Sequence, residues 1–97
     1  MIVRLSAGLL ALGLLTVPAS AASPTPQQRA EFYATCMGIA QNNELCTCKA
    51  DAALKLIDGE FMGMVIASMK GKAPPQNQNV AYNNYIAKSN AICKPGY

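Results

Sequence analysis

The sequence contains no histidine and no tryptophan, and only 13% of its residues are charged. Without histidine, neither a Ser-His-Asp triad nor an imidazole general base can be assembled. The glycines do not follow the spacing of a phosphate-binding loop. Asp51 and Asp58 lie seven residues apart, but Lys55 between them makes this an ordinary solvated stripe of a helix. We therefore expect a protein that is not an enzyme and that holds no cofactor.

Basic side chains are few and widely spaced, with eight Lys and Arg against five Asp and Glu. The last acidic residue is Glu60, and four lysines follow it. This late positive charge favours an acidic partner or anionic lipid headgroups. A dense stripe of Lys and Arg, which nucleic-acid binding requires, is missing, so we expect no nucleic-acid partner.

Residues 1–21 have the pattern of a Sec-type signal peptide. Arg4 supplies the early positive charge, residues 7–17 form a short apolar core, and Ala19 and Ala21 provide the small side chains of a cleavage site. The apolar core is too short to cross a bilayer as a helix. We expect cleavage on export, which leaves residues 22–97 as one small domain in the periplasm or, alternatively, secreted.

An even number of cysteines in an exported chain of this size indicates disulfides. A domain this small seldom has enough core to fold without covalent support. Two bonds, each worth roughly 3 to 4 kcal/mol through the entropy of the unfolded chain, would supply it. The four residues are Cys36, Cys46, Cys48 and Cys93.

The pairing follows in part from helix geometry. Cys46 and Cys48 are two residues apart, so in a helix their side chains point in nearly opposite directions and cannot bond to each other. One of them is expected to join Cys36 and the other Cys93, with the second helix as the hub. We slightly favour Cys36–Cys48 with Cys46–Cys93, because Cys36 and Cys48 lie equally far from a turn at Asn42. The swapped pairing, a redox-active Cys46/Cys48 pair and a zinc site are the alternatives.

The hydrophobic periodicity predicts an all-α fold, a small bundle of about four short helices stapled by two disulfides. No segment has the alternation of a strand. The helices are expected over about residues 26–41, 44–58, 60–70 and 79–93.

Local signals set the helix ends. Thr25 and Pro26 have the residue types of an N-cap and a first helical residue, after a flexible lead-in over residues 23–28. Asn42 with its neighbour breaks the chain between the first two helices. Asp58 is expected to cap the third helix, and glycine at position 71 to end it. Two prolines within residues 72–78 predict a polar loop without helix.

The last helix has the clearest apolar stripe in the chain. It predicts one buried face in which the two tyrosines bury their rings and direct their hydroxyls to solvent. Its members are Tyr82, Tyr85, Ile86, Ser89, Ile92 and Cys93.

The third helix is apolar on almost every side, so it belongs at the centre of the bundle or beneath a partner. The candidate partner or lipid surface is Phe61, Met62, Met64, Val65 and Met69. Methionine thioethers are also soft ligands that suit Cu(I), which makes Met62, Met64 and Met69 a less favoured copper site.

These observations predict a small exported helical protein that acts as a non-catalytic binding or interaction module, with a protein as its expected partner. One alternative is a membrane- or lipid-active disulfide-linked protein, with lysines at headgroups and the third helix against acyl chains. The other alternative is Cu(I) handling through the clustered methionines.

Overall fold

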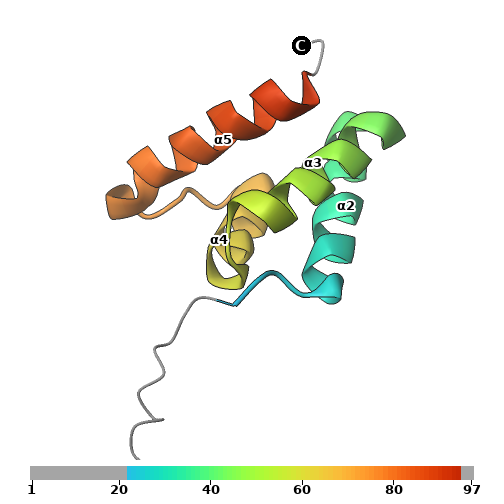
Figure 1. Ribbon diagram of the computed structural model, residues 1–97. Coiled ribbons are helices and arrows are strands. Elements are labelled where there is room, and N and C mark those ends of the chain that lie inside the picture. The colour runs from blue at the N-terminus through green and yellow to red at the C-terminus, as the bar shows by residue number, and fades with distance from the viewer. Residues whose placement is uncertain (1–21, 95–97) are drawn as a thin grey trace, which may run out of the picture.

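The computed structural model describes residues 22–94, and the predicted signal peptide lies outside them. The described part is all-α and contains no strand, which confirms the predicted fold class (Figure 1). Its helices are α2 (Pro26–Ala40), α3 (Asn43–Leu56), α4 (Gly59–Met69) and α5 (Asn79–Cys93), with a 3-10 turn η3 (Gln76–Gln78) before α5.

The start of α2 is fixed by a capping box. The Thr25 hydroxyl accepts the backbone N–H of Gln28, and the Gln28 side chain accepts the backbone N–H of Thr25, each at 3.0 Å. The amide nitrogen of Gln28 also donates to the carbonyl oxygen of Gly59 at 2.8 Å, and the Gly59 N–H donates to Ala22. The predicted flexible lead-in over residues 23–28 is therefore wrong, because Ala22 is hydrogen-bonded to the first turn of α4 and α2 already begins at Pro26.

The other predicted helix boundaries are confirmed to within about two residues. Gln41 ends α2 in the left-handed region at φ 53°, and the Asn42 side chain caps α3 by accepting the N–H of Leu45. Asp58 caps α4 through the N–H of Phe61 at 2.8 Å. Gly71 has φ 105°, a conformation that glycine adopts without strain, and it follows the end of α4.

The segment between α4 and α5 differs from its prediction in one respect. Residues 76–78 form the short turn η3, which begins directly after Pro75. A proline there is compatible with the start of a helical turn, because its fixed φ suits that position and no N–H is required of it. The remainder, residues 72–75, is a loop as expected.

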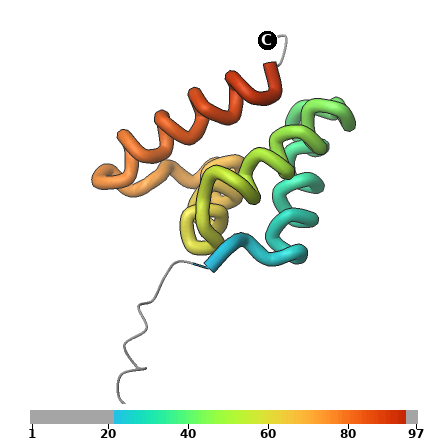
Figure 2. Tube along the Cα trace, in the orientation of Figure 1, coloured from blue at the N-terminus to red at the C-terminus, as the bar shows by residue number. Residues whose placement is uncertain are grey.

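Helix α3 is central, since α2 packs on one side of it and α5 on another, while α4 packs against α2 (Figures 1 and 2). All four helices contribute to one buried core, which is consistent with the layered packing of small helical domains. The fully or nearly fully buried members are Phe32, Cys36, Cys46, Ala50, Ala53, Met62, Val65, Ile66 and Tyr85.

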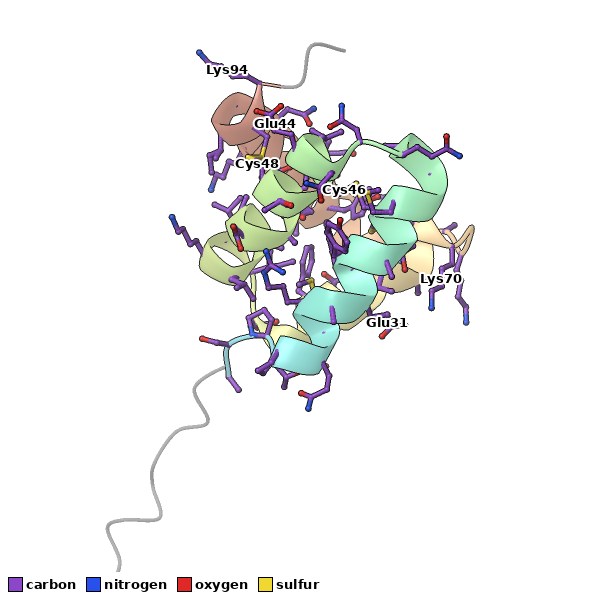
Figure 3. The ribbon with its side chains drawn as sticks, turned by 90° about the vertical axis from the view of Figure 1, so that its right-hand side faces the viewer. Glu31, Glu44, Cys46, Cys48, Lys70 and Lys94 are labelled. Carbon is purple, nitrogen blue, oxygen red and sulfur yellow. A yellow bond between two sulfur atoms is a disulfide. The ribbon has the colours of Figure 1, made fainter. Side chains whose placement is uncertain are left out.

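The disulfides join Cys36 to Cys46 and Cys48 to Cys93, so the slightly favoured pairing is wrong and its alternative is correct. Cys36 and Cys48 are each six residues from Asn42 and Cys46 is four, a difference of about 3 Å along a helix, which is too small for distance from the turn to decide the pairing. The side of the helix does, because Cys46 shares its buried face with Ala50. Figure 3 shows Cys46 towards α2 and Cys48 on the side of α5. The expectation that α3 is the hub is confirmed.

Candidate functional site

An apolar cavity of about 220 Å³ lies beneath α5 and is lined by residues of all four helices. Helix α5 packs mainly on α3. The cavity is lined by Phe32, Cys36, Ile39 and Ala40 of α2, Leu45 and Lys49 of α3, Val65 and Met69 of α4, and Tyr82, Tyr85, Ile86 and Ser89 of α5.

The walls combine core side chains with one exposed apolar side chain. Phe32, Val65 and Tyr85 belong to the buried core. Ile39, by contrast, is 62% exposed although it lines the same cavity. An exposed isoleucine at the edge of an apolar cavity gives an entering apolar group a surface to cover.

A polar corner interrupts the apolar wall. The Lys49 ammonium donates to the Ser89 hydroxyl oxygen at 2.7 Å and to the side-chain carbonyl oxygen of Asn90. Ser89 is only 1% exposed, so this bond satisfies a hydroxyl that water barely reaches. Burial lowers the pKa of Lys49 below its usual value, because the charged form loses hydration.

Tyr85 is the residue through which α5 contributes to the buried core. It is 4% exposed, and its ring meets Phe61 of α4 edge to face, with 6.3 Å between the ring centroids. Burial, with a smaller contribution from the neighbouring Tyr82, raises the pKa of Tyr85 to about 12. The prediction that its hydroxyl reaches solvent is therefore wrong. The Tyr82 hydroxyl is within hydrogen-bond distance of the Ser68 hydroxyl, at 3.2 Å.

A second, more open cleft of about 360 Å³ lies on the other side of Tyr85. Asp58 and Lys88 are among its lining residues, so its wall is polar as well as apolar. Tyr85 is the one residue that lines both the cavity and the cleft. The other α5 residues that line them lie on opposite sides of the buried stripe of that helix. Of the two, the cavity beneath α5 has the apolar walls typical of ligand sites.

The predicted stripe of α5 is correct for its central members but too wide at one end. Tyr85 and Ser89 are buried, and Tyr82 and Ile86 pack against the core, whereas Ile92 is 53% exposed. The disulfide from Cys93 explains the difference, because it fixes the end of α5 with Cys93 facing α3 and turns Ile92 outwards.

The residues of the predicted partner surface on α4 do not form one exposed surface in the fold. Met62 and Val65 are core residues, with Met62 0% exposed, so neither is available to a partner. Met64 is only partly buried and Met69 lines the cavity, so the methionines divide among different environments. Met62 and Met69 share a side of α4, but seven residues separate them by two turns, about 10 Å. A common copper site is not formed by these residues.

The remaining cysteine alternatives are excluded by the bonding. All four sulfurs are in disulfides, so none is free as a redox thiolate or a zinc ligand. Within residues 22–94, no group of three His, Cys, Asp or Glu side chains could hold a metal ion. Asp51 pairs with Arg29 at 2.8 Å and Asp58 caps α4, so both carboxylates of the predicted solvated stripe have structural partners.

The Lys49–Ser89 pair has the residue types of a Ser-Lys hydrolase, but not the other requirements. Such enzymes need an accessible nucleophile and preorganised N–H donors for the oxyanion. Ser89 is buried in the interior of α5, where the backbone N–H groups are engaged in helical hydrogen bonds. The arrangement is suited to holding an ammonium in place beside an apolar space, and not to acyl transfer.

The sequence interpretation missed Lys49 and the cavity itself. A signal for Lys49 exists, since it is one residue from Cys48 and three from Cys46, and so lies on the part of α3 that faces other helices. The cavity has no comparable signal, because it is the space left between four helices.

The chain matches no protein-family model, no curated protein and no solved structure. None of the described helices is long and apolar enough to span a bilayer. The two disulfides indicate an oxidising compartment, where such bonds form and persist.

Proposed function

We propose that the protein is an exported, non-catalytic binding protein whose cavity beneath α5 receives a small molecule with an apolar group. The observation that carries this proposal is the apolar cavity of about 220 Å³, which is lined by side chains of all four helices. Apolar protein cavities of about 150 Å³ bind benzene, so this space is sufficient for a group of roughly six carbon atoms.

The disulfides support a binding role because they hold the cavity in shape. Cys48–Cys93 fixes the far end of α5 against α3, and Cys36–Cys46 fixes α2 against α3. A site that is already formed binds its ligand without the entropic cost of ordering the chain. The signal-peptide pattern of residues 1–21 supports export to the periplasm, with secretion as the alternative.

A large protein partner, a membrane surface and copper have less support. The exposed large hydrophobic residues within residues 22–94 are Ile39, Val80 and Ile92, which lie on different helices or helix ends. The centre of the predicted lipid surface, Met62 and Val65, is core. A small ligand in the cavity therefore agrees better with the geometry than a broad contact surface does.

The test is a titration of the oxidised protein with 1-hexanol, followed by amide chemical shifts in heteronuclear NMR. We expect shift changes at the cavity residues Ala40, Leu45 and Ile86, and little change near Asp51 on the opposite side of α3. Saturable binding at the cavity supports the proposal. Absence of binding, or shifts spread evenly over the surface, contradicts it.

Two matched variants localise the site. Ala40→Phe places a ring in the cavity and is expected to weaken hexanol binding at least tenfold, because Ala40 lines that space. Ala34→Phe adds the same ring to an exposed position of the same helix and is expected to leave binding unchanged. Equal losses in both variants contradict the cavity as the site.

A further inference from the structure

We infer that the ligand of the cavity is a free monocarboxylate with a short apolar tail, and that its carboxylate binds to Lys49 while the tail fills the apolar space. This inference rests on the proposed function. Its basis is the position of one ammonium group, which lines an otherwise apolar cavity and is held there by α5.

The hydrogen bonds of Lys49 leave part of its capacity unused. An ammonium has three N–H donors. Two of them go to Ser89 and Asn90, both of which are neutral acceptors on α5. These bonds orient the side chain across the α3–α5 interface. Within residues 22–94 the third N–H has no protein acceptor, and this is the donor that we assign to the carboxylate.

Lys49 also has no negative partner among the described residues. The two ion pairs within residues 22–94 join Arg29 to Asp51 and Lys70 to Glu31, the second of which is labelled in Figure 3. Helix α5 contains no Asp or Glu, and no acidic residue of α3 lies three or four positions from Lys49. The charge complementarity of the site is therefore incomplete until an anion binds.

Partial burial makes this lack of a partner significant. Partial burial removes part of the hydration of the Lys49 ammonium and lowers its pKa. An entering carboxylate would supply the missing opposite charge and form a charge-assisted hydrogen bond, about twice as strong as a neutral one. A cationic or uncharged head group would not.

The size and polarity of the corner favour a carboxylate over a phosphate. A phosphate carries three strong acceptor oxygens and up to two charges, which need several donors or an Arg cluster. This corner contains a single cation, Lys49, whose neighbours already accept from it. The cavity volume of about 220 Å³ is sufficient for a short alkyl chain or one aromatic ring.

The experiment compares three six-carbon probes that differ in their head group: hexanoate, 1-hexanol and hexylammonium. With the oxidised protein at neutral pH and low salt, we expect hexanoate to bind about tenfold more tightly than hexanol, and hexylammonium more weakly than either. Added salt is expected to reduce the preference for hexanoate, because the ion pair is partly exposed.

Variants of two lysines on α3 complete the test. Lys49→Met is expected to remove the difference between hexanoate and hexanol, and Lys49→Arg to retain it. Lys55→Met, which removes an exposed lysine outside the cavity, is expected to leave the preference unchanged. Because the three probes are compared on the unmodified protein, the inference is tested even if Lys49→Met fails to fold.

The outcomes separate the inference from the proposed function. Equal affinity for hexanoate and hexanol, with both at the cavity, overturns the carboxylate inference and leaves the binding proposal intact. Absence of binding by all three probes overturns the proposed function and the inference with it. A preference for hexanoate that survives Lys49→Met overturns the assignment of Lys49 as the carboxylate-binding residue.

Discussion

Cys48 of α3 and Cys93, the last residue of α5, form a disulfide across 45 residues of chain, whereas Cys36–Cys46 spans only 10. The longer loop restricts the unfolded chain more, so the two bonds are worth about 4 and about 3 kcal/mol in the chain-entropy account. The long bond is also the covalent connection that holds α5 over the cavity at the end opposite the α4–α5 loop.

Removal of this bond should loosen α5 selectively. In the variant Cys48→Ala/Cys93→Ala we expect a loss of about 4 kcal/mol in unfolding free energy by urea titration. Amide hydrogen exchange should show reduced protection in α5 and retained protection in α2, α3 and α4. The reason is that α5 packs mainly on α3, whereas α2 contacts both α3 and α4.

The matched variant Cys36→Ala/Cys46→Ala removes the other bond. Both of these cysteines are buried in the core, so we expect reduced protection in all helices rather than in one. Identical exchange patterns in the two variants would show that α5 is not a separately held element.

Two glycines of α4 should respond in opposite ways to alanine. A Cβ at Gly59 would lie 3.1 Å from the Gln28 side-chain oxygen and close to two carbonyl oxygens, so Gln28 must move and weaken its bonds to Thr25 and Gly59. We expect Gly59→Ala to cost about 1 kcal/mol. A Cβ at Gly63 meets nothing within 4 Å, so Gly63→Ala should stabilise the helix by about 0.5 to 1 kcal/mol.

Thermal or urea unfolding of the two variants measures this difference directly. The comparison is internal, since the same chemical change is made twice in one helix. Stabilisation by Gly59→Ala would mean that the contact of residues 22–25 with the start of α4 contributes nothing to the folded state.

The helices were predictable from sequence because their ends depend on local chemistry. Thr25, Asn42 and Asp58 act as caps in the structure, and each effect involves residues only three apart. The disulfide pairing was not predictable from sequence. Two pairings were compatible with the spacing, and only the packed orientation of α3 selects one of them.

The candidate site was harder still to predict. Ser89 was placed correctly on the buried stripe of α5, but nothing in the sequence pairs it with Lys49, 40 residues earlier. A lysine in a helix is normally a solvent-exposed residue, so the pattern gave no reason to expect it at a cavity. The cavity depends on how closely α5 approaches three other helices, which is a property of tertiary packing and not of any segment.

The division of the α4 methionines is testable by truncation. Met62 is fully buried, so Met62→Ala removes its packing and leaves a space, at a cost of about 3 kcal/mol. Met64 is only partly buried and outside the core cluster, so Met64→Ala should cost about 0.5 kcal/mol. Urea unfolding checks both, and similar losses at the two positions would contradict the placement of α4.

Stability should fall at high pH through Tyr85. Its folded pKa of about 12 lies above the ordinary value of 10.0, so the folded state retains a proton that the unfolded state has lost between these values. The contribution of Tyr85 to the free energy of unfolding is fully present below pH 10. It is lost as the pH rises towards 12, by up to about 2 kcal/mol. Urea unfolding over this range, with tyrosinate absorbance to follow the ionisation, measures it.

The variant Tyr85→Phe serves as the control, since it keeps the ring against Phe61 and removes the ionising hydroxyl. It should lose less stability than the unmodified protein over the same range. Lys49 has the opposite effect on stability. Its pKa is lower in the folded state than in the unfolded state, so the unfolded state binds more protons between the two pKa values and stability rises with pH there. Lys49 is present in both proteins, so their difference isolates Tyr85. If the stabilities of the variant and of the unmodified protein changed in parallel with pH, the Tyr85 hydroxyl would be hydrated and Tyr85 would not be a buried core residue of α5.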